Sequence, residues 1–399
     1  MIVLAYIGVH QIFQLALAAQ EGGALGRLFC SVLDAPGRWG GWLARLGPAA
    51  AARPMGAEAL PAAKVSEIPC PLLARQIYSR LFKQSARDYY HSNAWFDRLA
   101  ARKLKTTQAQ VFVGTETCAL ACLREARRLG MKTVLDCPGI PAGFLAEQTS
   151  QSARELQIEM PIVSFSPRML RRKALELAEA DHLLVCSEFQ KRWYVETGFA
   201  AERIYVNPLW VDPSIAQVAA VAPPRVPRDR SLPLRVLFVG QATVSKGAPY
   251  ALLAAETLGD RVQMTFCGGV DSWVREWAGA RLKRHRIIPW MPREELPQVY
   301  QEHDVLVFPT LGDSFGFVAL EAMSFGLPVI ATTSAGAPLP AESWRVPPMD
   351  AGALADHLRR YDADRDQLAS DAQTARDFVR EYTPEAFRRR AQSIFQSLS

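Results

Sequence analysis

Short apolar runs alternate with amphipathic stretches along most of the chain. In the first half, such runs lie at residues 2–7, 111–113, 132–135, 182–185 and 204–206. Several of them precede a segment with helical periodicity, such as residues 11–20 after the first run and 188–198 after the fourth. Continuous apolar strands that alternate with helices are typical of parallel sheets built from βαβ units. The pattern predicts a Rossmann-like domain whose first strand ends in a turn at Gly8.

The same alternation restarts at Leu234, after a break. Strands are predicted at residues 235–239, 262–266, 305–308 and 329–331. Helices are predicted at residues 250–258, 294–302, 318–325, 351–360, 364–381 and 384–398. The break itself, residues 216–233, holds four prolines and charges of both signs, which is typical of a linker between domains.

These patterns divide the chain into two α/β domains. We expect an N-terminal Rossmann-like domain at residues 1–215, a linker at 216–233 and a second Rossmann-like domain at 234–383. Residues 384–399 should form a final helix that packs back on the N-terminal domain. A length of 399 residues suits two domains.

Charge and cysteine content narrow the class of protein. The 46 lysines and arginines exceed the 40 aspartates and glutamates, and a net charge of +6 suits anionic small molecules or an acidic membrane surface. The charge is too diffuse to indicate nucleic acid, and no recognition helix or base-stacking module accompanies it. None of the seven cysteines forms a C-x-x-C pair, so we expect reduced, buried cysteines rather than a metal or redox site.

The apolar N-terminus resembles a targeting segment only superficially. Residues 1–20 lack a positively charged start, and His10, Gln11 and Gln14 interrupt them, which favours a strand and a helix over a signal peptide. No run reaches the ~18 apolar residues that a spanning helix needs. We therefore expect a cytoplasmic protein that crosses no membrane.

A loop with candidate phosphate-binding residues follows the first strand of the second half. It contains Gly240, Gln241 and Lys246. A glycine turn at the carboxyl end of a strand allows the backbone to approach a ligand, and a nearby lysine can neutralise a phosphate. The spacing is not that of a Walker A loop. The alternative is a surface lysine in an ordinary βα loop.

A second candidate loop, residues 309–316, follows the strand at 305–308 and opens a helix. Small residues at a helix start leave backbone N–H groups for an anion, and the helix dipole favours a diphosphate. Asp313 and Ser314 are also suitable N-caps. Glu321 lies in the otherwise apolar helix, where a carboxylate is costly unless it is paired. A ribose diol would be a suitable partner, and the alternative is a solvated glutamate on the helix face.

In their order along the chain, these segments resemble the donor domain of family 4 glycosyltransferases, a retaining family with the GT-B fold. The resemblance runs from Arg235 to Thr332. It rests on Gly240 with Lys246-Gly247, on Cys267-Gly268-Gly269, on Pro292-Arg293-Glu294-Glu295-Leu296, and on the run from Asp313-Ser314-Phe315-Gly316 through Glu321 to Ile330. Residues 186–189 and 206–212 resemble the family more loosely. The resemblance implies two Rossmann-like domains that face each other across a cleft.

The resemblance also implies roles for individual residues. Lys246 would contact the donor diphosphate, Glu321 would hold the ribose hydroxyls, and Asp313 would face the sugar hydroxyls. Backbone N–H groups from Phe315 to Val318 would touch the phosphates, which Gly8 would approach from the other domain. The implied donor-binding residues are Gly8, Gly240, Gln241, Lys246, Gly268, Asp313, Ser314, Phe315, Gly316, Phe317, Val318 and Glu321.

Three positions depart from the family pattern. Asp313 stands where the family usually has a glutamate, and it is one methylene shorter. Gln241 stands where many members carry an arginine for the diphosphate, which leaves Lys246 as the main cation. Trp210 replaces a common glycine and is expected to narrow the cleft.

The first half offers weaker candidates, since the family's N-domain histidine has no obvious equivalent. Asp136 is a candidate for facing the reacting sugar, and we group it with Lys246 and Asp313 as catalytic candidates. His10 is a second candidate on the acceptor side, with a plain loop histidine as the alternative. Residues 75–105 interleave basic and aromatic side chains, which fits either an interfacial helix on an anionic membrane or a solvated helix with its aromatics in the core.

The resemblance thus implies a retaining glycosyltransferase that uses a UDP- or GDP-linked hexose and a glycan or lipid-linked acceptor in bacterial surface-polysaccharide synthesis. No metal or cofactor is expected, because no D-x-D motif stands at a strand end. The alternatives are a GT-B nucleotide-sugar epimerase and a nucleotide-sugar-binding protein without catalysis. A dehydrogenase is disfavoured, because no G-x-G-x-x-G follows the first strand.

Overall fold

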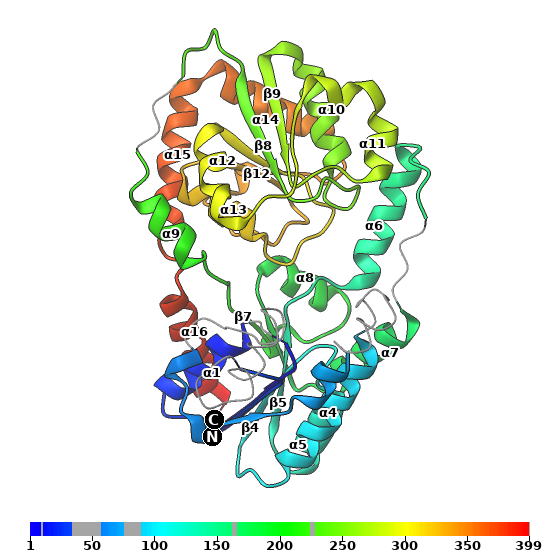
Figure 1. The fold of residues 1–399 in the computed structure, drawn as a ribbon, viewed down its shortest axis with the longest axis vertical. Helices are drawn as coiled ribbons and strands as arrows, with labels where there is room; N and C mark the ends of the chain where they lie inside the picture. The colour runs from blue at the N-terminus through cyan, green and yellow to red at the C-terminus, as the bar shows by residue number, and fades with distance from the viewer. Residues whose placement is uncertain (9–10, 34–56, 76–88, 162–165, 224–227, 399) are drawn as a thin grey trace.

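The computed structural model describes residues 1–8, 11–33, 57–75, 89–161, 166–223 and 228–398. They form two lobes, each built around a parallel sheet (Figure 1). None of the helices in these ranges combines the length and apolarity that a bilayer span requires.

The sheet of the first lobe has the strand order β3-β2-β1-β4-β5-β6-β7. Its strands are β1 (Ile2–Tyr6), β2 (Leu25–Cys30), β3 (Val65–Glu67), β4 (Val111–Thr115), β5 (Lys132–Cys137), β6 (His182–Val185) and β7 (Ile204–Val206). The apolar runs locate β1 and β4 to β7. They miss β2, because Gly26 and Arg27 interrupt its apolar sequence, and β3, which is a three-residue edge strand.

The sheet of the second lobe repeats this order as β10-β9-β8-β11-β12-β13. Its strands are β8 (Leu234–Val239), β9 (Val262–Cys267), β10 (Arg286–Ile288), β11 (Val305–Phe308), β12 (Val329–Thr332) and β13 (Arg345–Val346). In both sheets the chain reverses its winding direction after the third strand. The gaps between β1 and β4 and between β8 and β11 are therefore the topological switch points, at whose carboxyl ends doubly wound sheets bind ligands.

Helices flank both sheets and connect the lobes. Those of the first lobe are α1 (Ile12–Glu21), α4 (Tyr90–Leu104), α5 (Leu120–Arg128), α6 (Ala142–Glu155), α7 (Pro167–Glu179) and α8 (Glu188–Glu196). Those of the second are α10 (Ala248–Leu258), α11 (Ser272–Ala278), α12 (Leu296–Glu302), α13 (Phe317–Ser324), α14 (Ala351–Ala363) and α15 (Arg365–Val379). Short 3-10 turns are η2 (Ala57–Ala59), η3 (Ala62–Lys64), η4 (Ala201–Arg203), η5 (Gly259–Arg261), η6 (Gly279–Arg284), η7 (Arg293–Glu295) and η8 (Glu342–Trp344).

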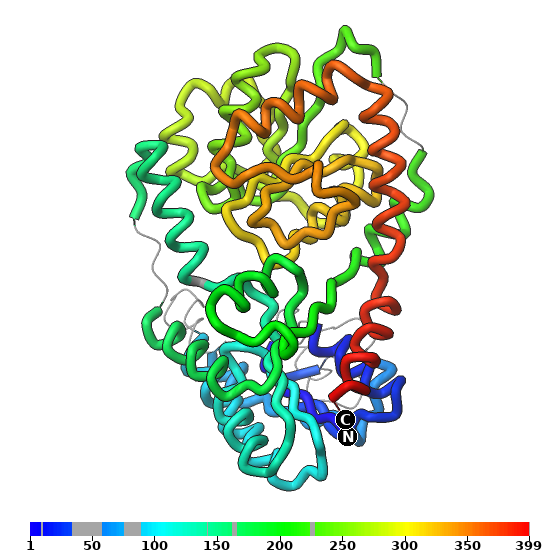
Figure 2. The backbone as a smooth tube through the Cα atoms, turned by 180° about the vertical axis from the view of Figure 1, so that it is seen from behind, coloured from blue at the N-terminus to red at the C-terminus, as the bar shows by residue number. Residues whose placement is uncertain are grey.

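Two segments of chain cross between the lobes side by side. The first leads into α9 (Pro213–Ala220), so the start of the predicted linker is helical. Its N-cap is Asp212, whose carboxylate accepts the backbone N–H of Ser214 at 2.9 Å. The second leads from α15 into α16 (Pro384–Leu398), as Figure 2 shows from behind. The backbone N–H of Val211 donates to the carbonyl of Tyr382 at 2.9 Å and so joins the two crossings.

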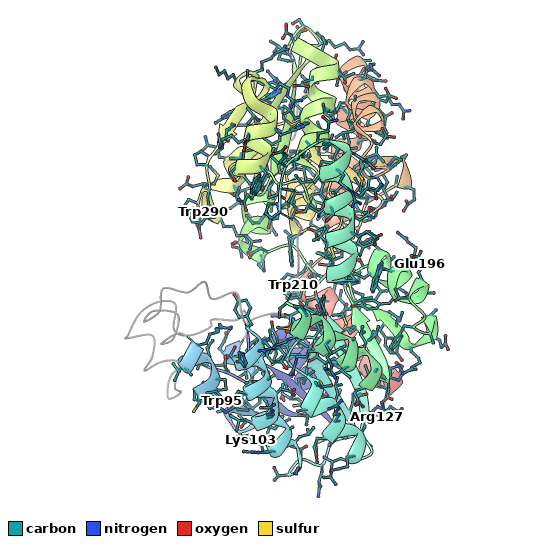
Figure 3. The ribbon with its side chains drawn as sticks, turned by 90° about the vertical axis from the view of Figure 1, so that its right-hand side faces the viewer. Trp95, Lys103, Arg127, Glu196, Trp210 and Trp290 are labelled. Atoms are coloured by element: carbon teal, nitrogen blue, oxygen red, sulfur yellow. The ribbon has the colours of Figure 1, made fainter. Side chains whose placement is uncertain are left out.

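The last helix packs on the first lobe. Helix α16 lies against α1, where Arg388 donates to the side chain of Gln14 at 2.9 Å. Trp210 meets the ring of Phe387 edge to face at 4.8 Å between centroids, and Figure 3 shows Trp210 at the level where the lobes meet. Trp210 therefore packs on the C-terminal helix, and its narrowing of the cleft stays a prediction.

Helix α6 belongs to the first lobe by sequence but packs on the second. Ser152 and the hydroxyl of Tyr250 are hydrogen-bonded at 2.9 Å, and the indole N–H of Trp277 donates to the carbonyl of Leu156 at 2.9 Å. Ala153 and Ile158 join the hydrophobic core of the second lobe. These contacts hold the lobes together on the side opposite α9 (Figure 1).

Candidate functional site

Two glycine turns end β8 and β9 beside the second switch point. Gly240 and Gly268 both have positive φ, at 115° and 120°. An added Cβ on Gly268 would lie 2.6 Å from the carbonyl carbon of Gly240, so any side chain there would drive the two turns apart. The glycines therefore allow the backbone of these two strand ends to pack directly together. Gln241, next in the chain, is exposed.

The loops after β8 and β11 bring Lys246 and Asp313 into contact. The lysine Nζ lies 2.5 Å from Asp313 Oδ2, and both side chains keep part of their surface in solvent. The carboxylate is fixed from the other side, since its Oδ1 accepts the backbone N–H of Phe315 at 3.1 Å. Two residues 67 positions apart in the chain, both catalytic candidates, are therefore one ion pair at the switch point.

The loop that carries Asp313 runs into helix α13. Gly316 is the N-cap and has a left-handed φ of 73°, and an added Cβ would lie 2.5 Å from the ring of Phe308. Phe315 is buried and its ring meets that of the exposed Phe317 edge to face at 5.4 Å. Ser314 and Val318 are half-buried. In this structure the N–H of Phe315 is engaged by Asp313, and the helix start after it lies beside the Lys246–Asp313 pair.

Glu321 is buried in α13, with 3% of its surface exposed. One carboxylate oxygen accepts the hydroxyl of Tyr300 at 2.9 Å, and the other is ion-paired with Arg293. Burial raises the pKa of Glu321, whereas Arg293 and Tyr300 lower it. The interpretation of Glu321 as a solvated helix-face residue is therefore wrong. Sequence reasoning noted that the buried carboxylate needs partners but did not identify these two.

The carboxyl ends of the two sheets face each other. The thiol of Cys186, after β6, donates to the carbonyl of Ser314 at 3.3 Å, and an added Cβ on Gly336 would lie 2.5 Å from the hydroxyl oxygen of Ser187. Burial raises the pKa of Cys186, with further increases from Asp136 in the first lobe and Asp313 in the second. The Cys186 thiol therefore lies close enough to both carboxylates for their negative charges to raise its pKa.

A fully buried amide, Gln190, fixes this edge of the first lobe. Its Oε1 accepts the backbone N–H of Cys186 at 2.9 Å, while its Nε2 donates to the carbonyls of Cys137 and Gly139 at 3.0 and 2.8 Å. One side chain from α8 therefore joins the loops after β5 and β6. Such a satisfied buried amide specifies a single loop arrangement.

Asp136 lies at the end of β5, with 1% of its surface exposed. Its Oδ1 accepts the amide of Gln11 at 2.8 Å, and its Oδ2 accepts the hydroxyl of Thr115 at 3.1 Å. Burial raises the pKa of Asp136 to about 7, against the opposing effect of these two hydrogen bonds. Glu116 follows at the end of β4 and pairs with Lys173 at 2.8 Å.

Asp136→Asn is expected to stabilise the protein in alkaline solution. With a native pKa of about 7 and an unfolded value near 3.8, the folded state retains a proton that the unfolded state loses, so stability falls as the pH rises between these values. Asparagine keeps both hydrogen bonds, because its oxygen can accept from Gln11 and its amide can donate to Thr115. We expect a gain of roughly 1–3 kcal/mol well above pH 7 that shrinks toward pH 4. Thermal unfolding across this range measures it, and a gain independent of pH would contradict it.

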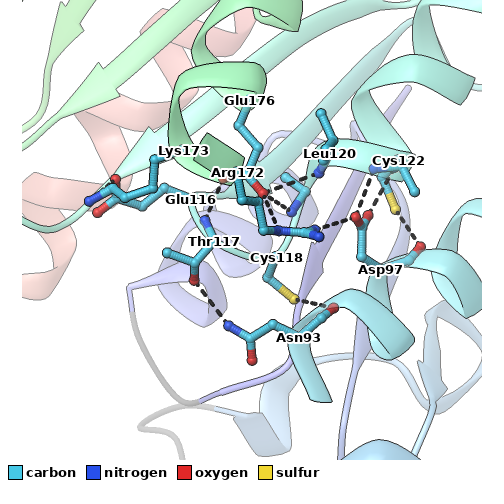
Figure 4. Close-up of polar contacts among 12 residues, drawn as sticks. Asn93, Asp97, Glu116, Thr117, Cys118, Leu120, Cys122, Arg172, Lys173 and Glu176 are labelled. Atoms are coloured by element: carbon cyan, nitrogen blue, oxygen red, sulfur yellow. Dashed lines mark hydrogen bonds and ion pairs between the residues drawn. The ribbon is translucent and has the colours of Figure 1, made fainter. Parts of the chain in front are cut away.

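A buried ionic network fixes the loop between β4 and α5 (Figure 4). Arg172 contacts Asp97 at 2.5 Å and Glu176 at 3.0 Å. The two carboxylates in turn accept backbone N–H groups at the start of α5: Asp97 takes those of Ala121 and Cys122, and Glu176 takes those of Thr117, Ala119 and Leu120. The N-terminus of α5 is therefore occupied by protein carboxylates. Sequence reasoning did not identify this network, whose members come from α4, the β4–α5 loop and α7.

The surroundings of the remaining predicted residues say little about the roles predicted for them. Gly8 is half-buried beside the ring of Tyr6. His10 lies outside the described residues. Of segment 75–105, residues 76–88 lie outside the described residues. In the rest of it, Phe96 is fully buried, whereas Tyr89 and Trp95 are each 43% exposed (Trp95 in Figure 3), and contact with a membrane stays a prediction. Where the structure describes the chain, no group of three or more histidine, cysteine, aspartate and glutamate side chains is arranged to hold a metal ion.

Comparison with known proteins finds a family match within the second lobe. Residues 233–364 match the family described as Glycosyl transferases group 1. The D-inositol 3-phosphate glycosyltransferase of Corynebacterium urealyticum is 30% identical over 181 residues, which cover 40% of this chain and 42% of that protein. The putative colanic acid biosynthesis glycosyltransferase WcaL of Escherichia coli is 28% identical over 238 residues, which cover 55% of this chain and 57% of that protein. The chain thus aligns with less than two thirds of either relative.

The fold is shared with solved structures over nearly the whole chain. The crystal structure of Anabaena HepE in complex with UDP aligns with 99% of this chain and 99% of that one, at a TM-score of 0.61 and 15% identity. At that identity the likeness establishes the fold. The prediction of two Rossmann-like domains in the GT-B arrangement is confirmed by this likeness and by the two strand orders.

Proposed function

We propose that this protein is a retaining glycosyltransferase that moves a hexose from a nucleotide diphosphate sugar to a glycan or lipid-linked acceptor in bacterial surface-polysaccharide synthesis. The observation that carries the proposal is the pairing of Lys246 with Asp313 at 2.5 Å where the second sheet reverses, beside the start of α13 and opposite the carboxyl ends of the first sheet. Support also comes from the group 1 family match of the second lobe and from the UDP bound to HepE.

The proposed donor would lie across the second switch point. Its ribose hydroxyls would donate to Glu321, and its diphosphate would lie against Lys246 and the first backbone N–H groups of α13. Lys246 would then exchange its contact with Asp313 for the phosphate oxygens, which frees Asp313 to accept hydrogen bonds from the sugar. Neutralisation of the leaving diphosphate by this lysine and the helix start requires no metal ion.

The first lobe would supply the acceptor side. Glu116 follows β4, which borders the first switch point, and Asp136 lies near the end of the adjacent strand β5, while the contact between Cys186 and Ser314 holds that edge against the donor loops. Contact between the lobes would exclude water, which otherwise hydrolyses the activated donor. Retention of anomeric configuration follows from the family resemblance, with the acceptor hydroxyl attacking from the face that the diphosphate leaves.

Donor binding tests the proposal most directly. Thermal shift and calorimetry with UDP-, GDP- and ADP-sugars would be measured on the wild type, on Lys246→Ala and Glu321→Ala, and on the matched control Glu276→Ala, an exposed glutamate of α11. We expect one nucleotide class to bind the wild type and the control, and both site variants to lose most of that binding. Absence of any shift at millimolar concentration would overturn the proposal. Binding and conversion of the sugar without an acceptor would point to the epimerase instead.

A further inference from the structure

Arg293 joins the donor site to the segment that crosses between the lobes. It is the first residue of η7, and one of its terminal nitrogens, Nη2, pairs with Oε1 of the buried Glu321. The other, Nη1, lies 3.4 Å from Oδ2 of Asp212, the N-cap of α9. The guanidinium therefore bridges two carboxylates that are 109 residues apart in the chain. Figure 1 shows α9 beside the lobe that carries α12 and α13, and these helices pack together.

We propose that Arg293 is a positioning residue for the nucleotide donor, which holds Glu321 ionised and correctly oriented for a vicinal diol and anchors that arrangement to Asp212 at the lobe crossing. This inference rests on the proposed function, in which Glu321 accepts the ribose hydroxyls. Arg293 itself acts through Glu321 and needs no contact with the donor.

The surroundings of Glu321 explain why an arginine is needed. The carboxylate is 3% exposed within a helix whose neighbouring residues Leu320 and Ala322 are fully buried and apolar. A buried carboxylate in such a place becomes protonated unless a positive charge or strong hydrogen bonds favour its ionised form. Tyr300 supplies one neutral hydrogen bond, so Arg293 is the charge that favours ionisation.

The geometry leaves capacity for a diol. A carboxylate can accept about four hydrogen bonds, and in the described part of the chain Tyr300 and Arg293 supply one to each oxygen. Two ribose hydroxyls would complete the set. Because one partner begins η7 and the other lies in α12, they fix the two carboxylate oxygens from two different positions and hold the carboxylate plane in one orientation. A guanidinium with a fixed fork geometry suits this role better than a lysine.

Asp212 makes the position of Arg293 depend on the crossing between lobes. Its Oδ1 is occupied by the N–H and hydroxyl of Ser214 at 2.9 and 2.6 Å, which leaves Oδ2 directed to Arg293. Burial raises the pKa of Asp212, but the bonds from Ser214 and the charge of Arg293 outweigh it, so the net shift is downward. An ionised carboxylate therefore anchors the outer side of the guanidinium.

The charge of Arg293 should set the pH at which the donor binds. The charged and titratable groups that act on Glu321 are Arg293 from η7 and Tyr300 from α12, which lower its pKa, and Asp212 from the start of α9, which raises it. Binding to the ionised carboxylate is present above this pKa and is lost as the pH falls through it. Without Arg293 the pKa of Glu321 moves further up, so binding should fail at a higher pH.

The test compares nucleotide binding across pH in Arg293→Met, Arg293→Lys and a matched control. The control is Arg286→Met, which removes another half-exposed arginine of the same lobe from its pair with Glu302 at 3.0 Å. Affinity for the best-binding nucleoside diphosphate and for its 2′-deoxy analogue would be measured by calorimetry between about pH 5 and pH 9. Thermal unfolding of each variant without nucleotide checks that the fold is retained.

In Arg293→Met we expect roughly tenfold weaker nucleotide binding near neutral pH. We also expect the pH below which binding is lost to rise by about one unit or more. The preference for the ribonucleotide over its 2′-deoxy analogue should shrink. Arg293→Lys should restore part of the binding at low pH. An affinity, pH profile and 2′-hydroxyl preference equal to those of Arg286→Met would overturn the inference while leaving the proposed function intact. A wild type that binds no nucleoside diphosphate would overturn both.

Discussion

Lys246→Met is expected to lower the rate of sugar transfer by roughly 10²–10³-fold, the effect typical of removing one group that stabilises developing negative charge. The lysine is the cation paired with Asp313 at the switch point, and Gln241 in the same loop supplies no second charge. The loss should appear mainly in kcat, because charge on the diphosphate grows as the bond to the sugar breaks. Initial rates of nucleotide release at saturating donor measure it.

A matched lysine separates this effect from a general loss of positive charge. Lys283 is exposed in η6 of the same lobe, and Lys283→Met should leave kcat unchanged. A kcat for Lys246→Met within about threefold of the wild type would contradict the assignment of Lys246 to the leaving group. A rise in KM with unchanged kcat would instead assign the lysine to ground-state binding.

Arg172→Met is expected to destabilise the first lobe by about 3–5 kcal/mol, the cost of leaving a buried carboxylate without its counter-ion. Its side chain is 7% exposed, and the side chains of its partners Asp97 and Glu176 are 1% and 0% exposed. Burial raises the pKa of Glu176 to about 7, and Arg172 is the charge that opposes this shift. Methionine fills similar space without charge, so the two carboxylates would have to take up protons or admit water.

Calorimetric unfolding measures this loss, and the first-lobe transition should move down by roughly ten degrees. Arg171→Met is the matched control, since Arg171 is exposed on the same helix and its removal should change little. A shift of only one or two degrees in Arg172→Met would show that the network is relaxed or hydrated in solution. Activity should fall as well, because the network holds the loop after β4 at the first switch point (Figure 4).

The sequence and the structure agree where local pattern carries the information. Buried central strands are continuous apolar runs, and β8, β9, β11 and β12 were predicted to within about a residue. Three of the four edge strands of the described sheets, β3, β10 and β13, were missed, because they are short and mix polar with apolar residues, whereas the edge strand β7 was predicted. Helix α6 was missed too, and only the structure shows that its residue Ala153 joins the core of the other lobe.

The site residues also divide into those that local sequence pattern indicates and those that only tertiary contacts reveal. Lys246, Asp313 and Glu321 are recognisable because each stands in a loop or helix whose local pattern makes a charged residue informative. Arg293 and Tyr300 were assigned no role, although Arg293 stands in a segment that carries the resemblance, because an arginine in a polar turn and a tyrosine in a helix are ordinary locally. Their importance appears only through contact with Glu321, 28 and 21 residues away.

The sequence by itself determined that the chain has two parallel α/β units, which loops are candidates for phosphate binding, and that Glu321 is a carboxylate in an apolar helix. Strand periodicity and helix starts are local properties, so they can be read from neighbouring residues. Only the tertiary structure decided that Lys246 pairs with Asp313, that Gln11 and Thr115 hold the buried Asp136, and that Arg293 joins Glu321 to Asp212. Those pairings depend on how separate elements dock, and docking is set by the packing of whole lobes, which no short stretch of sequence specifies.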